Sequence, residues 1–310
     1  MNKNVLIWGC GSIGLRHARL AADMGASVYC ISSKAGLPYP TAPSFAEIPA
    51  TWVPDVAIVA TPTALHGRHV ATLRDAKIPC ILVEKPVAAT LSQAPPLAQA
   101  DARGLLVAYN LRFHPGIQRL REILHGKKLL ALLLQVGQYL PSWRPDQDYR
   151  QSYSASTELG GGVLRDLSHE LDLACLFAGP WQRVTALSGK VSDLEICSED
   201  CVTLLAEHAQ CPQVSVHLNY LETPGNRKIS AVWEYGGATL DMVAGTLRHG
   251  NAEEHFTVDR DGTYRSQMRA LLTVEHDNCC TYEQGLDVVA YVEAAERAAI
   301  LKEWVCRSPR

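Results

Sequence analysis

Residues 3–14, KNVLIWGCGSIG, place a short apolar run directly before three closely spaced glycines. The run at 3–8 predicts a strand, and the apolar pattern that continues to Met24 predicts a helix. Between a strand and a helix, G-x-G-x-x-G spacing permits a tight turn, close approach of the backbone to a pyrophosphate, and close packing of helix on strand. The helix N-terminus also offers N–H groups to phosphate. We therefore predict a dinucleotide-binding turn, with a merely tight turn as the alternative; its residues are Gly9, Gly11, Ser12, Ile13 and Gly14.

Short apolar strands alternate with helices through the rest of the first 118 residues. Strands are expected at 27–32, 55–60, 79–83 and 104–109, and helices around 65–76 and 91–101. This alternation is typical of a doubly wound parallel sheet. Residues 1–118 are thus expected to form a Rossmann domain.

The pattern changes near residue 128, where strand-like runs begin to follow one another directly. They lie at 129–140, 183–191, 201–207, 213–221, 228–235 and 238–243, and several alternate apolar with polar residues. Such alternation predicts a large, mostly antiparallel open sheet with one buried face. One helix is expected at about 163–177 and a long one at 282–303, which is a candidate to pack back towards the first domain. The fold class is therefore α/β, with a second α/β domain at 119–310.

The composition argues against several kinds of protein. The 310 residues carry a net charge of -3 with well-mixed signs, so no nucleic-acid partner is expected. The chain has no apolar stretch near the roughly 18 residues of a membrane span and starts at once with a strand pattern, so we expect a cytoplasmic protein without a membrane partner. Its ten cysteines are scattered rather than clustered with histidines, which predicts no metal site.

The end of the second expected strand bears on the choice between NAD and NADP. An NAD site usually has an acidic residue there, which bonds the ribose 2′-hydroxyl. This chain has Ser32, Ser33 and Lys34 instead. Hydroxyls and an ammonium group tolerate a 2′-phosphate, so the sequence slightly favours NADP over NAD.

The fourth expected strand ends in Glu84-Lys85-Pro86, at the edge where open α/β sheets bind ligands. A lysine at this edge can hydrogen-bond a substrate hydroxyl and stabilise its alkoxide as hydride leaves. Thr61, Pro62 and His66 follow the third strand and are expected to line the same crevice, although a capping or core role for His66 is equally open.

The assembled motifs resemble the Gfo/Idh/MocA family of sugar and inositol dehydrogenases. The resemblance runs over nearly the whole chain and is carried by GCGSIG at 9–14, ATPTALH at 60–66, EKP at 84–86, YNLRFHP at 109–115 and GGGVLRDLSHELD at 160–172. The block SWRPDQDYRQSYSAS at 142–156 resembles a subgroup associated with bacterial surface-polysaccharide sugar pathways.

This resemblance implies roles for individual residues. Lys85 corresponds to the family's catalytic lysine, His169 to its proton donor or acceptor, and Asp166 to the acid before that histidine. Many members separate this acid and histidine by four positions, whereas the spacing here is three, so Asp172 is a second candidate to support His169. The resemblance also implies that the second domain binds substrate and forms homodimers or homotetramers through its sheet.

Helical geometry supports the grouping of these three side chains. On one α-helix, Asp166, His169 and Asp172 would fall within about 120° of one side. A carboxylate beside an imidazole fixes its tautomer and suits reversible proton transfer. Further substrate-binding candidates follow the fifth strand or lie in the 142–156 loop, where aromatic and charged groups suit a sugar ring or a phosphate; they are Asn110, Arg112, Trp143, Arg144, Tyr149, Arg150 and Tyr153.

The sequence thus predicts an NAD(P)-dependent oxidoreductase that transfers hydride between nicotinamide and a hydroxyl or keto carbon of a sugar, cyclitol or nucleotide-sugar. The sequence also allows two alternatives. One is an NAD-dependent glycosidase of the same family, and the other is a dinucleotide-binding regulator without catalytic activity.

Overall fold

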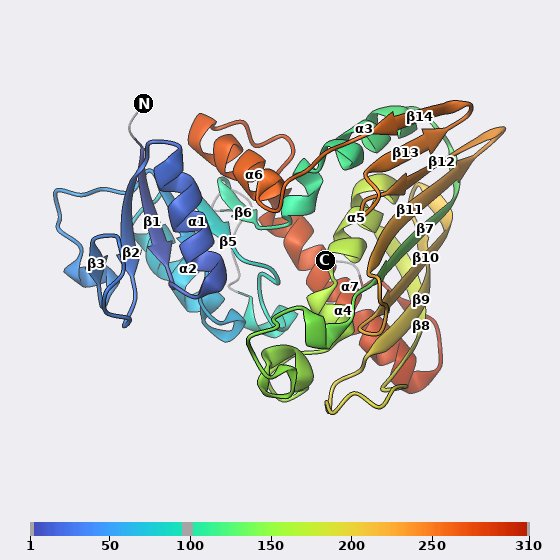
Figure 1. Cartoon of the computed structure of the whole chain (residues 1–310), viewed down its shortest axis with the longest axis horizontal. Helices are drawn as coiled ribbons and strands as arrows, with labels where there is room; N and C mark the ends of the chain where they lie inside the picture. Colours follow the sequence, from blue (N-terminus) through green and yellow to red (C-terminus); the bar gives the residue numbers. More distant parts are fainter. Residues whose placement is uncertain (1–2, 95–101, 309–310) are drawn as a thin grey trace. The chain divides into compact units, whose positions relative to one another are not determined.

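A computed structural model of the chain describes residues 3–94 and 102–308 (Figure 1). Contacts divide the chain into two compact units, Met1–His114 with Asp259–Val289, and Pro115–Val258 with Ala290–Arg310. The first unit therefore includes a late segment, 259–289, that the sequence analysis placed in the second domain.

The first unit contains a seven-stranded sheet with the order β15-β6-β5-β4-β1-β2-β3. All neighbours are parallel except β15, which is antiparallel to β6. β2 and β4 lie on opposite sides of β1, and in open α/β sheets ligands bind at such a switch point. The strands are β1 Asn4–Trp8, β2 Ser27–Ile31, β3 Thr41–Ala42, β4 Val56–Val59, β5 Cys80–Val83, β6 Leu105–Val107 and β15 Cys280–Thr281.

Apolar sequence explains the central strands, because β4 and β5 are buried at every residue, as expected of a parallel sheet. The helices of this unit are α1 Ser12–Asp23, α2 His66–Asp75 and α6 Gly262–Thr273, with 3-10 turns η1 Phe45–Glu47, η2 Thr63–Leu65, η3 Leu91–Gln93 and η4 Asn110–Phe113. The helix expected at 91–101 is only a 3-10 turn at its start, and residues 95–101 lie outside the described part of the chain.

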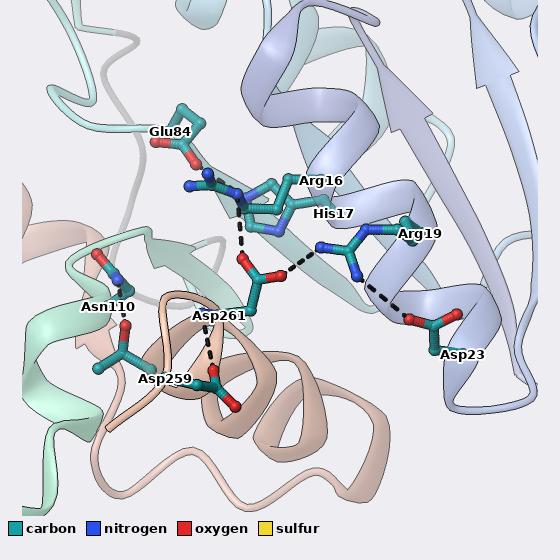
Figure 2. A network of polar contacts seen from close by, with 9 residues as sticks. Arg16, His17, Arg19, Asp23, Glu84, Asn110, Asp259 and Asp261 are labelled. Atoms are coloured by element: carbon teal, nitrogen blue, oxygen red, sulfur yellow. Dashed lines mark hydrogen bonds and ion pairs between the residues drawn. The ribbon is translucent and has the colours of Figure 1, made fainter. Parts of the chain in front are cut away.

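Polar contacts and a shared core hold the late segment within the first unit. Asp261, directly before α6, pairs with Arg16 of α1 at 3.3 Å and also with Arg19 (Figure 2). The Asn110 amide donates to the Thr263 hydroxyl at 2.6 Å. On its apolar side, α6 contributes Met268 and Leu271 to the core around Val5 and Ile7.

The second unit contains a nine-stranded sheet with the order β14-β13-β12-β11-β7-β10-β9-β8-β16. Neighbouring strands are antiparallel except β7 and β10, which confirms the predicted mostly antiparallel sheet. Its strands are β7 Leu129–Gly137, β8 Trp181–Gly189, β9 Cys201–His208, β10 Cys211–Asn219, β11 Asn226–Trp233, β12 Gly236–Asp241, β13 Thr246–His249, β14 Ala252–His255 and β16 Val305–Cys306.

Alternating residues explain how this sheet is covered on one face. In β9, Val202, Leu204 and Ala206 are buried, whereas Thr203 and Leu205 are exposed. Helix α3, Pro115–Leu124, contacts β12 and β13, and α5, His169–Ala178, contacts β7 and β10. Short 3-10 turns lie at η5 Leu140–Ser142, η6 Tyr149–Gln151 and η7 Tyr153–Ala155, and the long helix α7, Tyr282–Leu301, precedes β16 in the chain.

The prediction of one continuous helix at 163–177 is wrong in one respect, because the helix is interrupted between Asp166 and His169. α4 covers Val163–Asp166 and α5 begins at His169. The backbone bonding changes at this point: Leu167 still donates to Val163 four residues back, but Glu170 donates to Leu167, only three back. Asp166 and His169 therefore belong to different helical segments, and the regular spacing argument does not apply to them.

Candidate active site

The three glycines of the 9–14 turn differ in whether packing within the protein requires a glycine. An ideal Cβ on Gly9, which has a φ of +99°, would lie 2.6 Å from the Ala60 carbonyl oxygen. A Cβ on Gly14 would lie 1.9 Å from the Gly9 carbonyl oxygen. A Cβ on Gly11 would meet nothing within 4 Å, so packing within the protein does not require glycine there.

The space beside Gly11 fits a bound pyrophosphate. Gly11 is the N-cap of α1, and neither a capping side chain nor an acidic residue in the first turn occupies the positive end of the helix. Gly11 and Ser12 are exposed, and Ile13 is half-buried. The turn therefore has the open backbone and the charge that a dinucleotide diphosphate requires.

The end of β2 is also open. Ser33 and Lys34 are exposed, and the Ser32 hydroxyl oxygen accepts a hydrogen bond from the Lys34 backbone N–H at 3.1 Å. No carboxylate follows β2 before β3 begins. This segment therefore tolerates a 2′-phosphate, as the sequence predicted, but none of its contacts requires one.

Lys85 follows β5 on a segment that is held at both sides. One Glu84 carboxylate oxygen accepts from the Lys85 backbone N–H at 3.2 Å, and the other lies 2.8 Å from Nε2 of His17. On the far side of Lys85, the Pro86 carbonyl oxygen lies 3.0 Å from Nδ1 of His66. The Lys85 side chain is partly exposed, so the backbone is fixed while the side chain is accessible.

His66 lies inside the first unit and contacts backbone oxygens of two loops. Its side chain is buried, with Nε2 2.9 Å from the Thr61 carbonyl oxygen and Nδ1 facing Pro86. Burial lowers the pKa of His66, while its contacts with the two carbonyl groups oppose that shift. His66 thus connects the segment at Thr61-Pro62 with the segment that carries Lys85.

His69 supports the same segment from α2. Its ring stacks on Trp8 with centroids 4.1 Å apart, and Nδ1 lies 3.0 Å from the Thr61 hydroxyl oxygen. Burial, together with the nearby Arg68 and His66, lowers the pKa of His69 to about 4, so the ring is neutral at physiological pH. None of the sequence motifs indicated a role for His69.

The structure places Asn110 and Arg112 in the interior of the first unit. Both are buried. Arg112 donates to the Gln284 side-chain oxygen at 2.7 Å and to the Cys279 carbonyl oxygen at 3.2 Å, while Asn110 bonds Thr263. These contacts anchor the late segment of this unit, and substrate binding by either residue stays a prediction.

In the second unit, the glycine triplet lies against the loop before it. A Cβ on Gly161 would be 2.1 Å from the Tyr153 carbonyl oxygen, and the Tyr153 hydroxyl donates to the Gly160 carbonyl oxygen. A Cβ on Gly162, where φ is +124°, would be 2.3 Å from the Glu199 carboxylate. The triplet therefore allows the 153–160 loop and Glu199 to approach the start of α4.

Asp166 is oriented by Tyr220, for which none of the sequence motifs indicated a role. Its Oδ2 accepts from the hydroxyl of Tyr220, with 2.7 Å between the oxygens. Burial and the Asp166 carboxylate raise the pKa of Tyr220, so the phenol keeps its proton and donates. The Trp143 ring packs edge-on against the Tyr220 ring, with the ring centroids 5.2 Å apart. The structure therefore brings the predicted residues Trp143 and Asp166 together around Tyr220.

The other predicted residues of α4 and α5 differ in accessibility. His169 begins α5 and is half-buried, as is Asp166, whereas Asp172 is 1% exposed. Two ion pairs flank them: Arg165 binds Glu296 at 2.7 Å, and buried Glu170 binds Arg227 at 2.7 Å. Asp166 is therefore the more accessible of the two candidate acids.

The 142–156 loop borders an open hollow of about 560 Å³. Arg150 lies in its wall and pairs with Asp148 at 2.8 Å and with Glu195 at 3.3 Å, while the Tyr149 hydroxyl accepts from the Glu195 backbone N–H. Arg144 is exposed. The hollow is lined by Arg150, Ala155, Ser156, Lys190, Asp193, Leu194, Glu195, Ile196 and Cys197, so its two cationic and two anionic side chains balance.

Two further features are absent from residues 3–94 and 102–308. No group of three or more His, Cys, Asp or Glu residues there could hold a metal ion. None of the helices in these ranges has both the length and the hydropathy needed to cross a bilayer.

A Rossmann sheet with an open glycine turn, followed by a large open sheet, defines a two-unit dinucleotide-dependent oxidoreductase. The model of the oxidoreductase family with an NAD-binding Rossmann fold matches residues 3–110, and the model of the GFO/IDH/MocA C-terminal domain matches residues 117–258. The chain belongs to the GFO/IDH/MocA family. This confirms the resemblance drawn from its motifs.

Solved structures share this fold at low sequence identity. GenD2 from gentamicin A biosynthesis, in complex with NAD, is 21% identical with a TM-score of 0.79, covering 99% of this chain and 97% of its own. The WlbA dehydrogenase from Bordetella pertussis, in complex with NADH and UDP-GlcNAcA, is 17% identical with a TM-score of 0.77, and a myo-inositol dehydrogenase from Corynebacterium glutamicum is 19% identical with a TM-score of 0.78; both comparisons cover 100% of each chain. Among curated proteins, none matches at a significant level.

Proposed function

We propose that this chain transfers hydride between NAD(H) and a hydroxyl or keto carbon of a sugar, cyclitol or nucleotide-sugar. The observation that carries the proposal is Lys85, on a backbone fixed by Glu84 and His66, in the same unit as the open glycine turn. Both follow strands of one parallel sheet, at the edge where such sheets bind ligands. NAD, when bound, supplies the carbon that accepts or donates hydride.

NAD is the proposed cofactor rather than NADP. The relatives GenD2 and WlbA carry NAD or NADH, and the slight preference for NADP inferred from Ser32, Ser33 and Lys34 has no support among them. In this chain the diphosphate would lie over Gly11 and Ser12, where the helix N-terminus provides the donors.

The protein's own groups would handle the oxygen and its proton. The Lys85 ammonium would bond the substrate oxygen and stabilise its negative charge as the C–H bond breaks. His169 would accept the hydroxyl proton, and Asp166, held by Tyr220, would orient the imidazole. In the reverse direction His169 would return the proton to the alkoxide.

A sugar or cyclitol is the substrate class that the second unit supports best. Trp143 and Tyr153 provide aromatic surface near Asp166 and the glycine triplet. The two cationic and two anionic side chains of the hollow beside the 142–156 loop balance. This hollow therefore offers no net positive charge to a nucleotide diphosphate. A nucleotide-sugar would have to bind its phosphates elsewhere.

We also propose that the outer face of the nine-stranded sheet joins copies of this chain. Leu133 of β7 and Leu205 of β9 both lie opposite Ser215 of β10 and are 48% and 51% exposed. With Trp304 they border a groove of about 430 Å³. Exposed apolar surface of this kind marks contact sites, and Leu205→Asp should shift the sedimenting species towards the monomer if this face is the contact.

The catalytic proposal is tested by turnover of a polyol and nucleotide-sugar panel, followed at 340 nm with NAD. Lys85→Met should lower kcat by about 100-fold or more, since one donor at a developing oxyanion contributes roughly 3–4 kcal/mol. Its affinity for NAD should stay within several-fold of the unmodified protein, and Lys128→Met, which removes an exposed lysine, should behave as the unmodified protein. Unchanged turnover in Lys85→Met would refute the role of Lys85, and glycoside release without absorbance change would identify a glycosidase instead.

A further inference from the structure

His17 is a buried histidine that none of the motifs above includes. It lies on α1, three residues after the last glycine of the turn, and is 1% exposed. Its ring contacts Tyr264 of α6 edge-on at 5.9 Å, and the Arg16 guanidinium lies over the same Tyr264 ring at 4.9 Å. A charged or polar group so deeply buried needs a partner.

The partner of His17 is the residue directly before Lys85. Nε2 of His17 lies 2.8 Å from Oε1 of Glu84 (Figure 2), and Oε2 of the same carboxylate accepts from the Lys85 backbone N–H. The carboxylate thus has one oxygen for each neighbour. Two consecutive hydrogen bonds connect the helix that starts at the glycine turn with the backbone of Lys85.

This arrangement determines what happens to Glu84 when His17 is lost. The Glu84 side chain is 14% exposed, so its carboxylate can turn towards water if its buried partner disappears. Hydrogen bonds to a carboxylate are the stronger kind and hold its orientation. Rotation of the carboxylate would withdraw the acceptor from the Lys85 N–H. The His66 contact at Pro86 and the bond from the Glu84 backbone N–H to the Val59 carbonyl oxygen would remain.

We propose that His17 is a positioning residue: acting through Glu84, it fixes the backbone from which Lys85 reaches the substrate oxygen. The expected effect on turnover rests on the proposed function, whereas the hydrogen bonds from His17 through Glu84 to the Lys85 backbone do not. A purely structural histidine would stabilise the first unit without a selective effect at Lys85.

The test compares His17→Phe, which keeps a ring but removes the donor, with His17→Gln, whose amide nitrogen can still donate to Glu84. Leu20→Ala is the control, because Leu20 is equally buried in α1 but has no polar group to offer. Two readouts are used: hydrogen exchange of the Lys85 amide by mass spectrometry, in the absence of substrate, and kcat and KM in the 340 nm assay.

His17→Phe should speed exchange of the Lys85 amide at least tenfold and lower kcat at least tenfold, with KM for the substrate within threefold. His17→Gln should return both values to within threefold of the unmodified protein. Leu20→Ala should lower the melting temperature without changing exchange at Lys85. If His17→Phe fails to fold, Glu84→Gln takes its place and should also speed exchange of the Lys85 amide.

The proposal is overturned if His17→Phe leaves exchange at Lys85 unchanged. It is also overturned if Leu20→Ala speeds that exchange as much, or if His17→Gln is no better than His17→Phe at equal melting temperature. Failure of the proposed function looks different, because the unmodified protein would then turn over no substrate while the exchange result still reports on the link from His17 to Lys85.

Discussion

Tyr220 donates its phenolic hydrogen to Asp166, with 2.7 Å between Oη and Oδ2. Tyr220 directly follows β10 and is fully buried, whereas Asp166 ends α4 and is partly exposed. The sheet therefore fixes one carboxylate oxygen and leaves the rest of the group accessible. Asp172 is almost completely buried, so of the two candidate acids Asp166 is better suited to act near a substrate.

Tyr220→Phe should lower turnover about tenfold, because an unfixed carboxylate spends less time in the productive orientation, a cost of about 1.4 kcal/mol. The free energy of unfolding should fall by about 1 kcal/mol, the usual net value of one hydrogen bond. Kinetics at 340 nm and urea unfolding measure the two effects. Tyr291→Phe is the matched control: it removes another fully buried hydroxyl, bonded to His208 at 3.0 Å, and should lose stability but keep turnover. Equal turnover in both variants would argue against the role of Tyr220.

Gly11→Ala and Gly14→Ala should separate binding from folding. The added methyl at Gly11 meets no protein atom within 4 Å, so the melting temperature should stay within about 2 °C while affinity for NAD falls at least tenfold. The methyl at Gly14 meets the Gly9 carbonyl oxygen at 1.9 Å, so this variant should be destabilised even without cofactor. Calorimetric titration and thermal unfolding give both quantities. Full NAD affinity in Gly11→Ala would place the diphosphate elsewhere.

Buried His208 should make the free energy of unfolding depend on pH. Its Nδ1 lies 2.7 Å from the Gly179 carbonyl oxygen and Nε2 lies 3.0 Å from the Tyr291 hydroxyl, contacts that a neutral ring with Nδ1–H satisfies. Burial lowers the pKa of His208 to about 4. Between the ordinary pKa of about 6.5 and this value, the unfolded chain binds a proton that the folded chain does not, so stability falls as the pH falls.

The measurement compares the unmodified protein with His208→Gln by urea unfolding at pH 7 and pH 5. The stability advantage of the unmodified protein should shrink by about 2 kcal/mol at pH 5, which is 1.5 pH units below the ordinary pKa. Exposed His255, replaced in the same way, should show little change. An advantage that grows on acidification would mean that His208 is charged in the fold.

Local sequence was enough to predict the glycine turn, the strands before it and after it, and the segment with Lys85. In each case the deciding residues are neighbours in the chain: Gly14 packs on the carbonyl group of Gly9 in the same turn, and β5 ends where the apolar run ends. The alternating strands of the second sheet were predicted for the same reason, because a buried face repeats every second residue.

Contacts between distant residues could not be predicted in this way. Asp261 binds Arg19, which lies 242 positions earlier in the chain. Thr263 accepts a hydrogen bond from Asn110, which lies 153 positions earlier. No local pattern identifies such partners, so helix α6 was not predicted, and only the start of the helix predicted at 282–303 was expected to return towards the first domain. His17 looked like one more residue of a helix, and Tyr220 like one more apolar position of a strand, although each proves to contact an acidic residue next to or within the proposed machinery.

Calorimetric titration of the unmodified protein with NAD and with NADP tests the central claim most directly, namely that a nicotinamide dinucleotide binds at the turn formed by Gly9, Gly11 and Gly14. We predict saturable binding of about one NAD per chain, tighter than that of NADP, with a matching rise in melting temperature by mass action. Absence of measurable binding for both dinucleotides would contradict the proposed site and the function built on it.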